Sequence, residues 1–145
     1  MNPNSLKILK TIAKNGELSL KEAAELSGKA SEGHTNQYPL ATLISEEFLG
    51  VTAPFPMMEG TEKMPEFMGA TFLHMNRLPK NKEEKVEYNG ITQSGSSFEN
   101  EKIFIRAKGA LYLDELKQRK NDRIIHFLIG FFTAILSTFL ANSIN

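Results

Sequence analysis

Apolar residues recur at helical spacing in three segments of the first fifty residues, so we expect three helices there. The first helix covers residues 5–14 and ends at Asn15–Gly16, a pair that suits a left-handed C-cap. The second begins at a capping-box pattern, residues 19–22, and ends at Gly28. The third runs from about residue 35 to residue 48 with four apolar residues at helical spacing: Leu40, Leu43, Ile44 and Phe48.

Three short segments have the composition of strands. Residues 17–20 form an extended piece between the first two helices, and residues 48–52 leave the third helix as a strand. Residues 102–106 form a third strand, which is followed by a helix that carries Leu111, Tyr112 and Leu116. The predicted order is therefore helix, strand, helix, turn, helix, strand, a long middle region, strand and helix.

This order is typical of a winged helix-turn-helix. Residues 102–116 are similar to the ending of many such domains, in which a strand and a residue pair precede a glycine, here Gly109, and a helix. The chain resembles the winged-helix superfamily over residues 5–53 and 102–118. The resemblance implies an α+β fold in which residues 1–118 form a winged helix-turn-helix with an enlarged β wing.

The stretch between the two wing strands, residues 54–101, is longer than an ordinary wing. Residues 70–75 and 85–88 have strand-like composition, with a polar turn at 78–84 between them, and residues 91–98 offer a competing register for the closing strand. The lead-in contains an adaptable apolar set that either binds a partner or, as we favour, packs on the domain: Met57, Met58, Met64, Phe67 and Met68.

The C-terminal segment is different, because no residue from 124 to 145 is formally charged. Residues 124–141, at 1.5 Å of rise each, nearly match the roughly 30 Å hydrocarbon core of a bilayer. A buried core helix is the alternative, but it would show polar residues on one face, and here apolar residues lie all round. The pattern therefore predicts a transmembrane helix at residues 124–144, and the chain resembles a tail-anchored, single-pass protein.

The flanks of this segment predict its orientation. Four cationic residues precede it and none follows it, so the positive-inside rule keeps the N-terminal domain in the cytoplasm, most readily at a bacterial inner membrane. The basic flank itself covers residues 119–123. The predicted membrane-flanking residues are Lys117, Arg119, Lys120 and Arg123, and small residues at every fourth position form a candidate helix–helix seam: Gly130, Ala134 and Thr138.

Composition excludes several function classes. The 145 residues contain no cysteine, which excludes a disulfide scaffold and thiolate chemistry, and 17 basic residues balance 17 acidic ones. The three histidines, His34, His74 and His126, show no metal-ligand spacing. We expect neither an enzyme nor a metal, cofactor or small-molecule substrate.

Nucleic-acid binding is a candidate activity, because the start of the third helix would be the start of the recognition helix. Asn and Gln can pair with adenine, and Tyr or Thr can hold phosphate. The candidate reading residues are His34, Thr35, Asn36, Gln37 and Tyr38, and the candidate wing contacts are Arg77, Lys80, Lys82 and Lys85. Against this, the third helix contains no Lys or Arg and ends in Glu46–Glu47, and the net charge is zero.

These patterns favour a small tail-anchored protein, similar in composition to bacterial or prophage-type membrane proteins. Its winged-helix domain would recruit or hold a protein partner at the membrane, or associate with itself. The first alternative is a membrane-tethered, DNA-binding transcription regulator. A second alternative makes the membrane helix itself the effector, acting through its oligomers.

Overall fold

The structure is a computed structural model that describes residues 1–29, 33–52, 66–79, 81, 85–94 and 100–143. The side chains of residues 94 and 138–143 lie outside that description. The chain separates into two units, Met1–Ala110 and Leu111–Asn145. The first unit is α+β, with short helices and two small sheets, and the second is the greater part of one long helix.

The first unit begins as the apolar pattern predicts. Asn2 caps the first helix by accepting a hydrogen bond from the backbone N–H of Asn4, and Gly16 ends it with a φ of 82°. Because a left-handed φ costs glycine nothing, the chain can reverse there into the first strand. The elements up to the second strand are α1 (Pro3–Asn15), β1 (Glu17–Ser19), α2 (Leu20–Ser27), η2 (His34–Gln37), α3 (Tyr38–Ser45) and β2 (Leu49–Val51).

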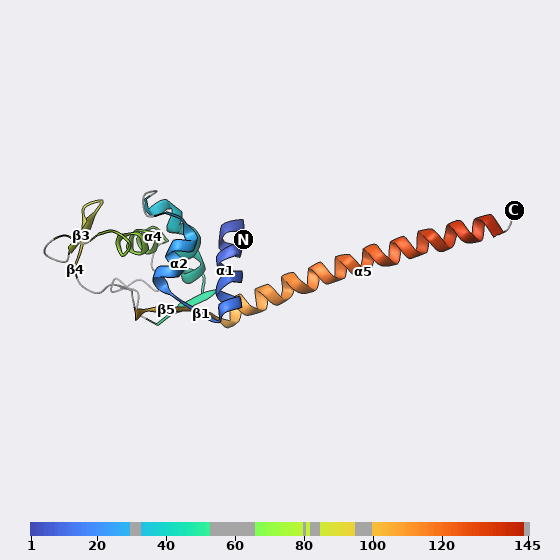
Figure 1. The fold of residues 1–145 in the computed structure, drawn as a ribbon, viewed down its shortest axis with the longest axis horizontal. Coiled ribbons are helices and arrows are strands. Elements are labelled where there is room, and N and C mark those ends of the chain that lie inside the picture. Colours follow the sequence, from blue (N-terminus) through green and yellow to red (C-terminus); the bar gives the residue numbers. More distant parts are fainter. Residues whose placement is uncertain (30–32, 53–65, 80, 82–84, 95–99, 144–145) are drawn as a thin grey trace. The chain divides into compact units, whose positions relative to one another are not determined.

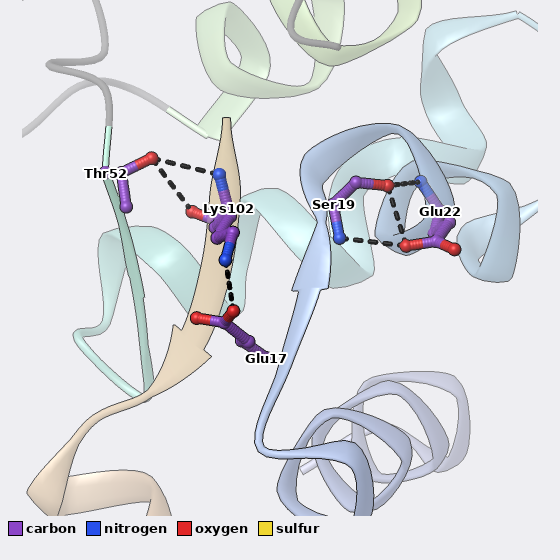
Figure 2. A network of polar contacts seen from close by, with 5 residues as sticks. All are labelled: Glu17, Ser19, Glu22, Thr52 and Lys102. Carbon is purple, nitrogen blue, oxygen red and sulfur yellow. Dashed lines mark hydrogen bonds and ion pairs between the residues drawn. The ribbon is translucent and has the colours of Figure 1, made fainter. Parts of the chain in front are cut away.

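The predicted capping box at the start of α2 is confirmed (Figure 2). The backbone N–H of Glu22 donates to the Ser19 hydroxyl at 3.2 Å, and the Glu22 carboxylate accepts from the Ser19 N–H at 2.9 Å. The Ser19 hydroxyl also donates to this carboxylate at 2.7 Å. The hydrogen bond from the Ser19 hydroxyl, and after it the bond from the Ser19 N–H, hold the pKa of the Glu22 carboxyl below its ordinary value. Two donors at the helix N-terminus are thus satisfied locally.

A three-stranded sheet completes the core of this unit (Figure 1). The strand β5 (Lys102–Ile105) lies between β1 and β2 and pairs antiparallel with both. Ile103 on β5 is fully buried, opposite Leu18 on one side and Val51 on the other. The core around it is aliphatic and fully buried: Ile8, Leu9, Ile12, Leu20, Leu40, Leu43 and Leu49.

The last helix is α5 (Ala107–Ser143), and its first turn contains Gly109. A Cβ on Gly109 would lie 2.4 Å from the backbone oxygen of Phe48 and 3.2 Å from Leu9 Cδ1. The first turn of α5 can therefore approach the α3–β2 connection only because residue 109 has no side chain.

The middle region differs from the predicted wing. Residues 70–75, expected as a strand, belong to the helix α4 (Glu66–Met75), in which six residues are buried. Such a continuous apolar run does not show a helical period, which is why its composition suggested a strand. The predicted strand at residues 85–88 is confirmed as β3 (Lys85–Tyr88). It forms a hairpin with β4 (Ile91–Ser94), so residues 91–94 do not replace β5 in the main sheet. The segment 54–65, with Met57, Met58 and Met64, lies outside the described residues.

The transmembrane prediction is wrong. Within the described part of the chain, none of the helices combines the length and the apolar character that crossing a bilayer requires. Three further predictions depended on the transmembrane helix and are wrong as well: the single-pass tail anchor, the inner-membrane localisation and the recruitment of a partner to a membrane.

The two glycines of α5 give a test of the close contact at its start. Gly109→Ala should cost about 1–3 kcal/mol in the free energy of unfolding, because the added methyl group meets backbone that cannot move aside. Gly130→Ala is the matched control, since a Cβ there meets nothing within 4 Å. Urea unfolding followed by circular dichroism measures both, and equal effects of the two substitutions would contradict the assigned contact.

Candidate functional site

The predicted reading residues lie in η2 and at the start of α3, but most of their atoms are engaged inside the protein. Gln37 is fully buried, and its side-chain amide donates to the backbone oxygen of Ala24 in α2 at 3.2 Å. Gln37 therefore fixes η2 to α2 and is not free to read a base. His34, Asn36 and Tyr38 are half-buried, and only Thr35 is exposed.

His34 belongs to a group of five rings that we call the histidine–tyrosine cluster: His34, Tyr38, Phe67, His74 and Tyr88. The hydroxyl of Tyr88 accepts a hydrogen bond from the His34 backbone N–H at 3.4 Å and is 3.1 Å from its ring nitrogen Nδ1. The His34 ring also contacts Phe67 edge-on at 5.1 Å and Tyr38 at 5.9 Å between centroids. The cluster thereby joins η2 and α3 to α4 and to the hairpin strand β3.

His74 is the buried member of the cluster. Its side chain is 2% exposed, and its ring packs edge-on against Tyr88 at 4.5 Å between centroids. Its Nδ1 has no hydrogen-bond partner in the part of the chain that the structure describes. Burial lowers the pKa of His74, and the nearby Arg77 and His34 lower it further. These surroundings therefore favour the neutral imidazole of His74 in the folded chain.

The helix α4 lies against the segment that was expected to face a ligand. It packs on both η2 and α3, and a Cβ on Gly69 would be 3.3 Å from the Cβ of Ala41. All eight residues of α3 are described, and each is at least partly buried. A recognition helix needs an exposed face to enter the major groove, and α3 does not present one.

Glu46 and Glu47, which the sequence marks as unfavourable for phosphate, are paired with cations. Lys108 donates to the Glu46 backbone oxygen at 2.8 Å and lies 3.4 Å from its carboxylate, while its ammonium is 4.7 Å from the Phe48 ring centroid. Arg106 lies 3.5 Å from the Glu47 carboxylate. These pairs are exposed, so each contributes little stability, but they neutralise the charge beside α3.

The predicted wing contacts are not brought together as a basic surface. Arg77 is half-buried directly after α4, and its Nη1 lacks a hydrogen-bond partner among the described residues. Lys85 is half-buried at the start of β3. Lys80 and Lys82 lie outside the described residues. The wing therefore supplies no continuous row of exposed cations in the described ranges.

The remaining predicted residues lie on α5, in the second unit. Lys117, Arg119, Lys120 and Arg123 are exposed, and Arg119 pairs with Glu115 at 3.6 Å, one helical turn away. Gly130 and Ala134 are exposed four residues apart on this helix, and the side chain of Thr138 lies outside the description. The role of the four cations as membrane-flanking residues depended on the membrane helix and loses its basis.

Sequence reasoning missed the partners of His34. Phe67 was expected to bind a partner or to pack on the domain, and Tyr88 and His74 fell in predicted strands, because contacts between residues 34 and 88 leave no local pattern. No group of three or more acidic or histidine side chains that could hold a metal ion occurs in the described residues. No known protein family, curated protein or solved structure matches the chain.

Acidification tests the buried state of His74. Its folded pKa lies below the unfolded value of about 6.5, so the unfolded chain takes up a proton that the folded chain refuses. The stabilisation is complete above that unfolded pKa and is lost as the pH falls below it. We expect the free energy of unfolding to fall between about pH 7.5 and about pH 5.5 more in the wild type than in His74→Phe.

The matched control for this comparison is His126→Phe, which changes an exposed histidine on α5. It should keep the full wild-type pH dependence in urea titrations. If His74→Phe keeps it as well, His74 is not the group that takes up the proton.

The hydroxyl of Tyr88 gives a second test of the cluster. Tyr88→Phe removes the acceptor of the His34 N–H and should cost about 1–2 kcal/mol in the free energy of unfolding, because a half-buried donor loses its partner. Tyr38→Phe is the control, since the Tyr38 ring touches His34 but its hydroxyl makes no hydrogen bond within the described residues. Thermal and urea unfolding should separate the two variants, and equal stabilities would contradict the assigned bond.

Proposed function

We propose that this protein is a non-enzymatic protein-interaction protein, in which a winged-helix-type domain acts as a structural scaffold and does not read base sequence. The observation that carries this proposal is the burial of α3 under α4. A domain of this kind that read DNA would keep the corresponding helix open to the major groove.

The order of elements supports the winged-helix assignment. Three helices and a short strand precede β2, and a late strand, β5, inserts between β1 and β2. The strand order β1–β5–β2 is the one expected if residues 49–51 and 102–105 are the two wing strands. In this proposal the residues between them are an insertion that contributes a helix and a separate hairpin in place of a simple wing.

The charge distribution also favours a protein partner. The net charge is zero, and two cations, Arg106 and Lys108, are paired with Glu47 and Glu46 just after α3. Nucleic-acid affinity depends on cations that can neutralise phosphates and release counterions. Cations already committed to carboxylates are poorly suited to that role.

One observation supports a second candidate, the binding of a nucleic-acid backbone without base reading. The helix α1 exposes Lys7, Lys10 and Lys14, and it contains no acidic residue. These three lysines make no ion pair within the described residues. They place three exposed cations on one helix, where a polyanion could contact them.

Titration of a fluorescent mixed-sequence DNA duplex with the full chain, across a salt series, tests the proposal. We expect no binding at about 0.15 M salt, because the three lysines of α1 can neutralise only a few phosphates. The matched variants are Thr35→Ala, which changes the exposed candidate reading residue, and the triple variant Lys7→Glu, Lys10→Glu and Lys14→Glu.

The outcomes separate the two candidates. Binding that Thr35→Ala weakens would overturn the proposal in favour of base reading from η2. Binding that only the lysine variant removes would favour backbone contact through α1. If cooperative unfolding shows that the chain is folded and the chain does not bind the duplex, the result agrees with a protein-interaction role.

A further inference from the structure

The charge-free part of α5 exposes a large apolar surface. From residue 124 to residue 136, nine large apolar side chains are between 38% and 72% exposed: Ile124, Ile125, Phe127, Leu128, Ile129, Phe131, Phe132, Ile135 and Leu136. In water, so many exposed apolar groups carry a large unfavourable hydration free energy.

The area involved can be compared with known interfaces. At about 100 Å² for each half-exposed large apolar side chain, the nine expose on the order of 900 Å². The largest apolar patch on a typical monomer is about 300–600 Å². A stable interface between two proteins buries about 800 Å² on each partner. The apolar surface of α5 therefore exceeds what a monomer usually leaves in water and is sufficient for a stable interface.

The two hydroxyl side chains of this segment, Thr133 and Ser137, do not oppose burial. The Thr133 hydroxyl donates to the Ile129 backbone oxygen at 2.8 Å, and the Ser137 hydroxyl donates to the Thr133 backbone oxygen at 2.7 Å. Burial of a hydroxyl is costly only when the hydroxyl loses its hydrogen bond. Both hydroxyls already have partners inside their own helix, so a second helix could cover them without adding an unsatisfied donor.

We propose that residues 124–137 of α5 are an association surface and that its occupant is the same segment of a further copy of this chain. Identical segments are complementary here, because each is apolar and free of formal charge over the same length. An acidic or basic partner would place its charges on a surface with no opposite charge. This proposal rests on the proposed function in one respect, because both take the partner to be a protein.

The distribution of apolar groups also indicates the size of the assembly. At 100° per residue the nine side chains span a sector of about 200° of the helix circumference, whereas pairing of two helices covers only a face of about 100° on each. Additional copies would cover the remaining faces. We therefore expect an assembly larger than a dimer.

Sedimentation equilibrium of the full chain without lipid or detergent tests the proposal. The wild type should sediment as a multiple of the 16.2 kDa chain mass, and the double variant Phe127→Lys and Phe131→Lys should sediment as a monomer. These two rings stack on each other at 6.5 Å on one side of the helix. Leu111→Lys is the matched control, because Leu111 is 64% exposed on the same helix but lies before the charge-free segment.

A wild-type monomer across the dilution series would overturn the proposal, as would an oligomer that the double variant leaves intact. Flotation with phosphatidylcholine vesicles distinguishes the other apolar occupant. A chain that is monomeric in water and floats with vesicles would assign the surface to lipid and overturn self-association. A failure of this kind leaves the DNA titration unchanged, so it is separable from a failure of the proposed function.

Discussion

The first unit depends on the insertion of β5 between β1 and β2, because these three strands come from distant parts of the sequence. The insertion buries Ile103 and satisfies both edges of β5 with backbone hydrogen bonds. Closing a loop of about fifty residues costs conformational entropy, although that cost grows only slowly with length. Contacts at the ends of the loop help to offset this cost, and Figure 2 shows the polar ones, between Thr52, Lys102 and Glu17.

At these ends, Thr52 and Lys102 exchange hydrogen bonds that continue the sheet. The Thr52 N–H donates to the Lys102 backbone oxygen at 3.0 Å, and the Lys102 N–H donates to the Thr52 hydroxyl at 2.9 Å. The hydroxyl in turn donates to the Glu101 carboxylate at 2.6 Å, while the Lys102 ammonium pairs with Glu17 on β1. Thr52 and Lys102 thus add polar contacts between β5 and the two strands beside it.

The features predictable from sequence are those with a local cause. Helix caps depend on residues three or four apart, so Ser19 and Glu22 identify the start of α2, and Gly16 and Gly28 the ends of α1 and α2. The helix α4 was missed because its apolar residues do not fall on one face. The sharp turn at Asn89 and Gly90, both with positive φ, carried a hairpin signal that the sequence interpretation passed over. The histidine–tyrosine cluster had no such signal, since His34 and Tyr88 are 54 residues apart.

The same distinction explains the wrong interpretation of α5. A long apolar helix without charges requires apolar surroundings. Its sequence does not show whether these are lipid or other helices, because both satisfy the requirement equally well. Length is the independent criterion for a bilayer, and no described helix meets it together with apolarity. The structure adds what the sequence could not, namely that Thr133 and Ser137 already satisfy their hydroxyls within the helix. A surface whose hydroxyls are satisfied before docking requires mainly shape and apolar contact from its partner, which is why we propose an identical helix as its occupant.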